Sequence, residues 1–479
     1  MNKSLNCFRR FALTGLVLFP SLLFAQLTEL QLDSTRLEVR EVVTGLTVPY
    51  DLVFGPDGWI WFSERNGDIH RIQPETGELQ LIHHVDEVFE SEDNSGMYAL
   101  ELHPDFPVVP YVYVNYTIEL FKARLVRFTY DQQRNTLRDS VHIIGNFPAQ
   151  ESHNGARIKF TADKKMLVAL GDVYRSEWVQ DMNKITGKIL RLNDDGSIPD
   201  DNPFPGSPIF TLGHRNPQGL TILPDGRIYE SEHGIANDDE LNRIEAGKNY
   251  GWPEVQGDCN FASEFAFCDS VKPGLPMRTW TPSWAPCGLE YFDHPAIPEW
   301  RNSLLQVFLK SGDGFYGQRM EVMTLDETGD GIREVREYFQ DTYGRLRDVL
   351  VAPDGRVFIC TSNQEKNGSV VVKPDDDKII ELRNPAFPLF KPEPNTYLPA
   401  SVNVYPNPAR DLLIIQFPVV EGKVNIRLID MAGRELRSES LDLSGFSYLF
   451  DRNGLMTGLY LMEVTLPNGD RVLKKVQFI

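Results

Sequence analysis

One short turn motif recurs along the chain and constrains its fold more than any other feature. It reads Gly-Pro-Asp-Gly at residues 55–58, returns as Pro-Asp-Gly at residues 224–226 and 353–355, and persists in degraded form at residues 161–167. Each copy joins a hydrophobic run to a second run of β-branched and aromatic residues, and Pro and Gly supply the backbone angles of a tight hairpin. A β-sandwich would not be expected to repeat one turn in this way, whereas a β-propeller does. The repeat therefore predicts an all-β chain with a propeller as its main domain.

The composition changes near the C-terminal end of this region. Five prolines between residues 385 and 400 predict a largely extended linker. Beyond it, residues 401–479 alternate turns with four short strands, expected at residues 412–415, 424–428, 458–464 and 472–476. These strands carry no clustered His, Cys or carboxylate side chains. We expect a small, non-catalytic β-sandwich there and assign the propeller to residues 26–384.

The first 25 residues have the form of a cleaved signal peptide. A basic start (Lys3, Arg9 and Arg10) precedes an apolar stretch from Phe11 to Phe24, and Ala25 then offers a small-residue cleavage site. The alternative is an N-terminal membrane anchor. The stretch is shorter than the ~20 residues that span a bilayer, and a proline interrupts it. We therefore expect a secreted or cell-surface protein, exported through the periplasm and the outer membrane.

The charge balance restricts the partners. The chain has 68 acidic and 48 basic residues and a formal net charge of −20, and loss of the basic signal peptide makes it more negative. Such a surface disfavours nucleic acids and anionic membranes as partners. Neutral substrates fit better, as do anions where cations gather locally.

Four cysteines remain once Cys7 leaves with the signal peptide: Cys259, Cys268, Cys287 and Cys360. An even number in an exported protein is compatible with disulfides. Cys259 and Cys268 bracket a short loop and are the favoured pair, although three connectivities stay open. No spacing resembles that of a zinc site.

Several polar stretches next to glycines fall at the ends of expected strands, where a propeller has its functional loops. They are residues 153–157, 169–172, 211–220, 231–241, 308–312 and 344–348. Together they resemble the soluble quinoprotein glucose/sorbosone dehydrogenase family, over roughly residues 44–381. The string Gly-His-Arg-Asn-Pro-Gln-Gly-Leu at residues 213–220 is the most specific match, and Gly-Lys-Asn-Tyr-Gly-Trp-Pro at residues 247–253 supports it. The resemblance implies a six-bladed propeller, followed here by the C-terminal β-sandwich.

The same resemblance implies a reaction and its cofactors. Members oxidise an aldose at the anomeric carbon to the lactone by hydride transfer to Ca²⁺-bound pyrroloquinoline quinone, and electrons then pass to an external acceptor. His153 matches the general base and Asp172 the carboxylate that orients it. An imidazole titrating near neutrality suits proton abstraction, and an adjacent carboxylate stabilises the imidazolium. The sugar, the acceptor and the formation of a homodimer stay open.

The cofactor-contacting positions of the family match a mainly cationic set: Arg215, Asn216, Lys310, Arg345, Arg347 and, in place of the family's Gln, the shorter Asn94. The quinone has three carboxylates, which an acidic chain would repel unless cations converge on them. Arg345 and Arg347 are expected on one face of a strand. The alternative for each arginine is an ordinary ion pair with a surface carboxylate.

Calcium ligation follows from the resemblance too. Main-chain oxygens matching Gly234 and Ile235 hold the cofactor-bound Ca²⁺, and such oxygens suit this hard cation. His233, Asp239 and Glu240 match side chains near a structural Ca²⁺ pair, with a solvated acidic turn as the alternative. The acidic loop at residues 326–331 lacks the EF-hand pattern, and we interpret it as a hairpin turn.

The C-terminal region has a resemblance of its own. The segments at residues 404–409, 430–434, 459–460 and 474–476 are similar to those of type IX secretion sorting domains. This implies recognition by the type IX secretion machinery, and leaves cleavage of the module open.

Two other functions stay open for the propeller. A Ca²⁺-dependent lactonase or esterase would share the fold, the histidine and the acidic ligands, but would not need converging cations. A non-catalytic propeller that binds carbohydrate or a cell-surface partner would need neither His153 nor those cations.

Overall fold

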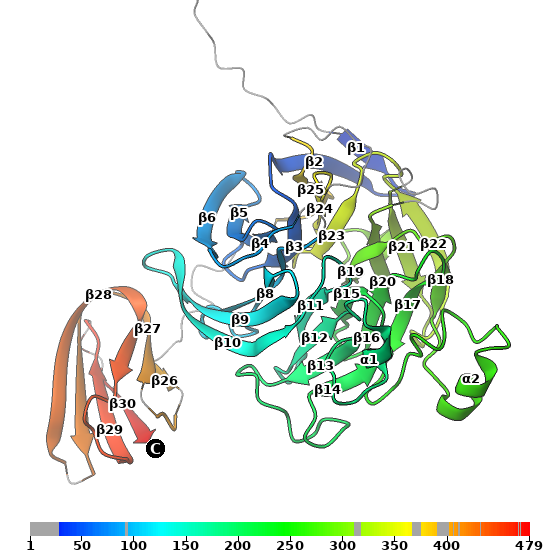
Figure 1. Cartoon of the computed structure of the whole chain (residues 1–479). Helices are drawn as coiled ribbons and strands as arrows, with labels where there is room; N and C mark the ends of the chain where they lie inside the picture. The colour runs from blue at the N-terminus through cyan, green and yellow to red at the C-terminus, as the bar shows by residue number, and fades with distance from the viewer. Residues whose placement is uncertain are drawn as a thin grey trace, which may run out of the picture.

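The computed structural model describes residues 28–91, 94–310, 318–365, 375–389 and, apart from positions 406, 411, 432, 468 and 470, residues 402–479 (Figure 1). The predicted signal peptide and most of the predicted linker lie outside these residues. Strands dominate the described part, and helix is confined to α1 (Ser176–Val179), α2 (Phe265–Val271) and a 3₁₀ turn at Pro298–Trp300. None of these helices has the length and apolar character needed to cross a membrane.

Five antiparallel sheets follow one another in chain order, each of four consecutive strands. The first contains β3 (Pro49–Phe54), β4 (Ile60–Glu64), β5 (Asp68–Gln73) and β6 (Glu78–His84). The second contains β7 (Met97–Leu102), β8 (Tyr111–Glu119), β9 (Lys122–Asp131) and β10 (Thr136–Pro148). The third contains β11 (Gly155–Phe160), β12 (Met166–Leu170), β13 (Lys188–Leu192) and β14 (Ile209–Leu212). The fourth contains β15 (Pro217–Ile222), β16 (Ile228–Glu232), β17 (Asp239–Ile244) and β18 (Arg278–Trp280). The fifth contains β19 (Pro286–Phe292), β20 (Ser303–Phe308), β21 (Met320–Leu325) and β22 (Ile332–Tyr338).

A sixth sheet joins the two ends of this region. It contains β23 (Leu346–Val351), β24 (Val357–Thr361) and β25 (Lys378–Arg383), and the N-terminal strand β2 (Arg36–Thr44) pairs with β25 while β1 (Thr28–Gln31) flanks it. The first strands of the sheets contact one another in the order β3, β7, β11, β15, β19 and β23, and β23 contacts β3 again. The described strands therefore form a closed propeller (Figure 1), and the six sheets agree with the number that the resemblance implied.

The recurring turn motif has one structural position. Its copies join the first strand to the second in four of the six sheets. In each copy the same two backbone bonds close the turn, for example Gly55 N–H to Trp59 O (2.7 Å) and Gly58 N–H to Gly55 O (3.0 Å). Gly58 has a φ of 80°, and in the degraded copy Lys164 takes the same left-handed position at 61°. The loop at residues 326–331 joins β21 to β22, which confirms the predicted hairpin.

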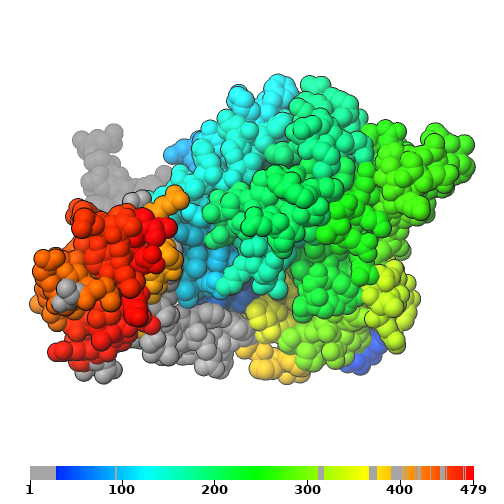
Figure 2. Space-filling view, turned by 90° about the horizontal axis from the view of Figure 1, so that it is seen from below, coloured from blue at the N-terminus to red at the C-terminus, as the bar shows by residue number. Residues whose placement is uncertain are grey.

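One disulfide is present within the described residues, between Cys259 and Cys268. It closes the segment that contains α2, which projects from the propeller in both views (Figures 1 and 2). Cys287 and Cys360 are buried free thiols. The favoured pair is therefore confirmed, and the other connectivities are excluded.

The C-terminal region forms five hydrogen-bonded strands: β26 (Asn403–Tyr405), β27 (Leu412–Asp430), β28 (Glu435–Asp451), β29 (Gly458–Thr465) and β30 (Arg471–Phe478). The expectation of separate strands at residues 412–415 and 424–428 was wrong. Both lie in β27, which continues because β28 pairs along most of its length, with a register shift between Gln416 and Val420. Leu413, Ile426 and Met462 are fully buried in one apolar core. The five strands form one hydrogen-bonded sheet around this core, so the β-sandwich stays a prediction.

A buried ion-pair network lies at the centre of the propeller. Arg157 on β11 contacts Asp51 on β3 (2.5 Å) and Asp348 on β23 (2.9 Å), and its Nε donates to the carbonyl of Gln218 on β15 (2.8 Å). Asp51 also accepts the backbone N–H of Leu100 on β7 (3.1 Å). All three charged side chains are at most 6% exposed. The network thus fixes the mutual positions of the inner strands.

We expect Arg157→Met to lower the free energy of unfolding by about 3–5 kcal/mol, because it leaves two buried carboxylates without their counter-charge. Denaturant-induced unfolding followed by tryptophan fluorescence measures the change. Arg336→Met is the matched control, since Arg336 forms only surface ion pairs with Asp33 and Glu334, each contributing about 1 kcal/mol or less. Equal effects of the two substitutions would contradict a central role for Arg157.

Candidate active site

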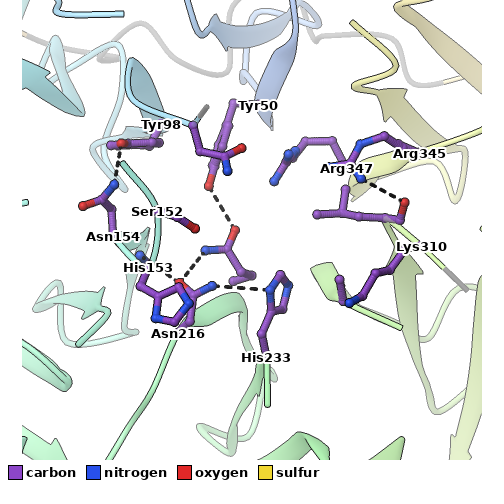
Figure 3. Close-up of a pocket in the computed structure, with 15 residues that line it drawn as sticks. Tyr50, Tyr98, Ser152, His153, Asn154, Asn216, His233, Lys310, Arg345 and Arg347 are labelled. Carbon is purple, nitrogen blue, oxygen red and sulfur yellow. Dashed lines mark hydrogen bonds between the residues drawn. The ribbon is translucent and has the colours of Figure 1, made fainter. Parts of the chain in front are cut away.

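A cavity of about 190 Å³ lies on the propeller axis, at the end opposite the recurring turns. Each of the six inner strands, or the residue next to it, contributes to the wall: Tyr50 of β3, Tyr98 of β7, Gly155 of β11, Gln218 of β15, Ala285 before β19, and Arg347 of β23 (Figure 3). The inner strands all begin at this end of the ring. Their first residues therefore converge although they are far apart in sequence.

Seven of the residues singled out from the sequence line this one cavity: Asn94, His153, Asn216, His233, Lys310, Arg345 and Arg347. Asp172 lies directly behind His153. Arg215, Gly234, Ile235, Asp239 and Glu240 are not among the lining residues. The structure therefore brings together one half of the predicted site and separates the other half from it.

His153 and Asp172 form a hydrogen-bonded pair. His153 Nδ1 lies 2.9 Å from Asp172 Oδ1, and their side chains are 11% and 3% exposed. A carboxylate only accepts, so Nδ1 is the donor and, in the neutral ring, Nε2 keeps its lone pair. His153 itself lines the cavity (Figure 3). The arrangement is one that would suit a general base with an orienting carboxylate.

Two neighbours that the sequence interpretation gave no role hold this pair. Trp252 Nε1 donates to Asp172 Oδ2 (2.9 Å), and the backbone N–H of Tyr174 donates to Oδ1 (3.0 Å). The Tyr174 ring stacks on the imidazole at 4.0 Å between centroids. Trp252 lies in the Gly-Lys-Asn-Tyr-Gly-Trp-Pro string, which signalled the family but not this contact. Asp172 is therefore fixed on both oxygens.

The backbone around His153 is tightly constrained. His153 has a φ of 60°, in the left-handed region that non-glycine residues rarely adopt. A Cβ on Gly171 would lie 2.0 Å from the His153 carbonyl oxygen, so only glycine allows the two segments to approach. Strained backbone of this kind is concentrated at functional sites.

A second group gathers positive charge on the other side of the cavity. Arg345 and Arg347 contact the same oxygen of Glu365, Oε2, with Arg345 Nη2 at 2.6 Å. Burial alone would raise the pKa of the Glu365 carboxyl, but Arg347 and Arg345 outweigh it and lower that pKa to about 2. The shared face predicted for the two arginines is confirmed. Glu365 had no recognisable signal in the sequence.

The electrostatic character of the cavity is cationic. One carboxylate serves two guanidinium groups, and Lys310 Nζ makes no hydrogen bond or ion pair within the described residues. Arg345 Nε is buried and has no hydrogen-bond partner there either. No Asp or Glu is among the lining residues. Against a net charge of −20, this excess of cations suits an anionic ligand.

Arg215 has a different neighbourhood from the one expected. Its Nη1 donates to the carbonyls of His233 (2.9 Å) and Gly234 (2.6 Å), and its guanidinium lies 5.3 Å from the centre of the Trp252 ring. Arg215 therefore connects the loop after β16 to the residue that holds Asp172. In this arrangement it supports the cavity wall from outside.

Asn216 and His233 form part of that wall. His233 Nε2 donates to the Pro286 carbonyl (2.9 Å), which leaves Nδ1 to accept from Asn216 Nδ2 (3.4 Å). Burial, helped by the positive charge of Arg215, holds the pKa of His233 well below its usual range. His233 is thus a neutral ring engaged on both nitrogens.

The acidic loop uses its carboxylates for internal hydrogen bonds. Asp239 accepts the backbone N–H groups of Gly234 (2.8 Å), Trp284 (2.6 Å) and Ala285 (2.8 Å), and burial raises its pKa. Among the described side chains, Asp239 belongs to no group of three potential metal ligands. The Gly234 backbone is held in place through its N–H, whereas Ile235 is 57% exposed.

Glu240 lies in a buried acidic group. Its carboxylate accepts Gly257 N–H (2.8 Å) and Asn242 Nδ2 (3.0 Å), and the same amide nitrogen contacts Glu230 (3.2 Å) and Glu232 (3.5 Å). Burial, with Glu232 nearby, raises the pKa of Glu240 to about 8. The alternative of a solvated turn is wrong for Glu240, which is buried.

Comparison with family models gives two matches. Residues 46–372 match the glucose/sorbosone dehydrogenase family, and residues 403–478 match the secretion system C-terminal sorting domain. Quinoprotein glucose dehydrogenase B of Acinetobacter calcoaceticus is 29% identical over 440 residues, covering 74% of this chain and 90% of its own. The aldose sugar dehydrogenase of Escherichia coli K12 is also 29% identical, covering 67% of this chain and 89% of its own.

Solved structures agree with these matches. The aldose sugar dehydrogenase of Streptomyces coelicolor, solved with pyrroloquinoline quinone bound, is 31% identical, with a TM-score of 0.63 over 73% of this chain and 99% of its own. A Thermus thermophilus protein described as a putative glucose dehydrogenase is 34% identical, with a TM-score of 0.62 over 72% of this chain and 99% of its own.

We expect Glu365→Gln to destabilise the fold, because two buried guanidinium groups lose their shared counter-charge, at a cost of about 3 kcal/mol near neutral pH. The folded-state pKa of about 2 lies below the ordinary value of 4.5. The carboxylate therefore contributes its full stabilisation above pH 4.5, and loses it as the pH falls towards 2. Unfolding curves across this range should show the wild type and the variant converging at low pH. A constant difference would contradict the ion-pair explanation, and Glu334→Gln at the surface is the control.

Proposed function

Because this chain belongs to the glucose/sorbosone dehydrogenase family, we propose that it oxidises an aldose at the anomeric carbon to the lactone, with Ca²⁺-bound pyrroloquinoline quinone as cofactor and an external electron acceptor. The observation that carries this proposal is the axial cavity, where a histidine–carboxylate pair faces three cationic side chains. A base and an anion site in one cavity meet the two requirements of this chemistry.

The residues fit the cofactor chemically. Pyrroloquinoline quinone supplies the hydride acceptor when it is bound, and Ca²⁺ polarises its reactive carbonyl. Lys310, Arg345 and Arg347 would bind its carboxylates. Within the described part of the chain, Arg345 Nε and Lys310 Nζ have no hydrogen-bond acceptor, so both could donate to this ligand. Asn94 and Asn216 offer amides to the same ligand.

For the proton, His153 is the proposed base. Its Nε2 would take the proton from the anomeric hydroxyl as hydride leaves the carbon, and Asp172 would stabilise the imidazolium through Nδ1. Trp252 and the Tyr174 backbone keep the carboxylate in place. This chain's own contribution is thus to hold the base in one tautomer and one orientation.

For Ca²⁺, the proposed ligands remain the main-chain oxygens of Gly234 and Ile235. Asp239 fixes the loop by accepting Gly234 N–H (2.8 Å), and the Gly234 carbonyl, which here accepts from Arg215 Nη1 (2.6 Å), would have to exchange that donor for the ion. We propose Asp239 as a support for the loop rather than a ligand, and Glu240 as an acidic neighbour suited to a further Ca²⁺.

The alternatives are less well supported. A lactonase or esterase has no need for three cations in a cavity without carboxylates, and a carbohydrate-binding propeller has no need for the fixed His153–Asp172 pair. The C-terminal match supports export. We propose that the type IX secretion machinery recognises residues 401–479 and delivers the protein to the cell surface or the extracellular space.

The function is tested by reconstitution. The purified protein is freed of metal and cofactor, titrated with pyrroloquinoline quinone and Ca²⁺, and then offered aldoses with an artificial dye as electron acceptor. We expect stoichiometric quinone binding and sugar-dependent dye reduction. Absence of both would refute the dehydrogenase, and lactone hydrolysis without quinone would favour the esterase.

His153→Ala should bind the quinone normally and lose dye reduction by at least a factor of about 100, as expected for loss of a general base. His142→Ala, which removes an exposed histidine on β10, should change neither. Unchanged turnover in His153→Ala would contradict the assigned base.

Lys310→Met should weaken quinone binding about tenfold or more, because a hydrogen bond to a charged group contributes about 1.5–3 kcal/mol. Fluorescence titration with the quinone measures this change. Lys310 has no ion-pair partner among the described residues, so the fold should be unaffected. Equal affinity of the variant and the wild type would remove Lys310 from the cofactor site.

A further inference from the structure

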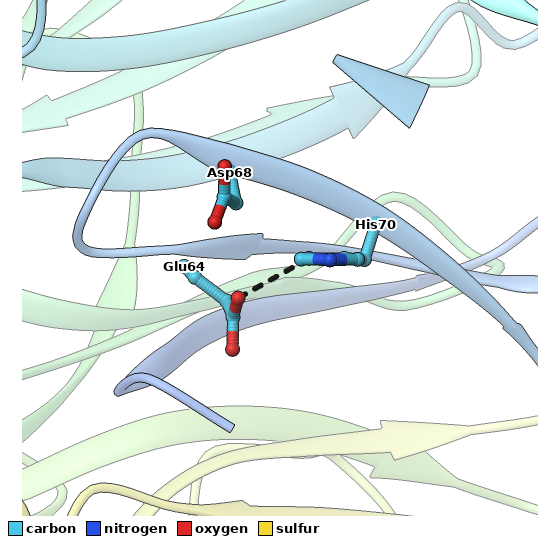
Figure 4. Close-up of side chains that lie close together, drawn as sticks. All are labelled: Glu64, Asp68 and His70. Carbon is cyan, nitrogen blue, oxygen red and sulfur yellow. Dashed lines mark ion pairs between the residues drawn. The ribbon is translucent and has the colours of Figure 1, made fainter. Parts of the chain in front are cut away.

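Three neighbouring strands of the first sheet place two histidines and two carboxylates on one face. In the antiparallel register Phe62 lies opposite His70, and Asp68 lies opposite His84. Glu64 is two residues beyond Phe62, and Asp68 is two residues before His70, so all share one face. Figure 4 shows Glu64, Asp68 and His70 directed towards a common point. None of these residues lines the axial cavity.

The distances between these side chains suit a bound cation. Ligand atoms of Glu64, Asp68 and His70 all lie within 4.8 Å of one another. His70 Nδ1 is 3.2 Å from Glu64 Oε2, and His84 Nδ1 is 2.6 Å from Asp68 Oδ1. Glu64 is 4% exposed and Asp68 20%, which leaves one side open to solvent.

A separate observation concerns His70. Its Nδ1 is buried yet makes no hydrogen bond, although the Glu64 carboxylate is within reach. The ring is held by stacking on Phe62, with centroids 5.4 Å apart and planes at 19°. A buried ring nitrogen without a hydrogen bond is costly and rare. A lone pair on Nδ1 would face the Glu64 carboxylate unfavourably, so this nitrogen carries either a proton or a metal ion.

The carboxylates are oriented by outer contacts. Glu64 Oε1 accepts the backbone N–H of Thr47 (2.6 Å), and Asp68 Oδ2 accepts from Asn66 Nδ2 (2.8 Å). Contacts of this kind fix ligands around metal ions. They also leave Glu64 Oε2 directed at His70.

We propose that Glu64, Asp68 and His70 bind one divalent transition-metal ion of the Zn²⁺ type, while His84 Nδ1 contacts Asp68 Oδ1 beside the site. Mixed imidazole and carboxylate donors suit Zn²⁺ and its neighbours in the series, whereas Ca²⁺ prefers oxygen alone. The site is separate from the proposed cofactor site and does not depend on the dehydrogenase function.

The position of the site indicates a structural role. Thr47 belongs to the connection between β2 in the sixth sheet and β3 in the first, and Phe62 packs in one core with Leu46 and Phe358. A metal ion bound through Glu64 would therefore strengthen the seam at which the ring closes. Binding to the folded state alone raises its stability by mass action.

The test uses the full-length protein, stripped with a chelator and then kept in excess Ca²⁺ so that calcium sites are filled. Co²⁺ is titrated while its visible absorption is recorded, and Zn²⁺ is then added to displace it. We expect one equivalent of each metal to bind and the melting temperature to rise. His70→Ala and Asp68→Asn should each weaken binding about tenfold or more.

His142→Ala is the matched control, and its affinity should equal that of the wild type. Asp68→Asn preserves size at a partly exposed position, so it keeps the test valid if His70→Ala fails to fold. Absence of saturable binding to the wild type would overturn the proposal. Binding that is unchanged in Asp68→Asn would overturn it too, and would show that the cluster forms histidine–carboxylate ion pairs only.

Discussion

The central constraint on this molecule is the buried guanidinium of Arg157. Through Asp51, Asp348 and the Gln218 carbonyl it connects inner strands of four sheets, and Asp51 extends the network to a fifth. The remaining inner strand, β19, packs against this network. A Cβ on its residue Gly288 would lie 2.4 Å from Asp348 Oδ1. Separating any partner would leave a buried charge without its counter-charge, so the network disfavours other arrangements of these strands. The same strands line the axial cavity, so the network also fixes the positions of the residues that line it.

The cavity is cationic although the protein is acidic, because the arginines beside it outnumber their carboxylate partners. Glu365 is shared between Arg345 and Arg347, so two positive charges are held with one negative charge. The excess is available to a ligand. On the other side of the cavity Asp172 is surrounded by donors from His153, Trp252 and Tyr174. The His153–Asp172 pair and the cationic group are therefore positioned independently, by separate sheets.

Much of the site could be predicted from the sequence, for a definite reason. His153, Asp172 and the Arg345–Arg347 pair lie in short strings whose residue types and spacing carry the chemistry. Trp252 and Glu365 could not be assigned from the sequence. Trp252 contacts Asp172, which is 80 residues away, and Glu365 contacts Arg345, which is 20 residues away. Only the packing of the chain shows these contacts. Arg215 illustrates the converse. Its motif was specific, but its side chain supports the His233 and Gly234 carbonyls outside the cavity.

The sequence by itself determined the class of fold and the family, since the recurring turn depends on local backbone angles and the motifs on residue type. It also favoured the Cys259–Cys268 pair, because the two residues are close along the chain. Only the tertiary structure decided that β2 completes the sixth sheet, that β27 runs on as one long strand, and that Glu64, Asp68, His70 and His84 share a face. All three features depend on strand register and on contacts between distant segments. Register and long-range contacts are not encoded in any local pattern of residues.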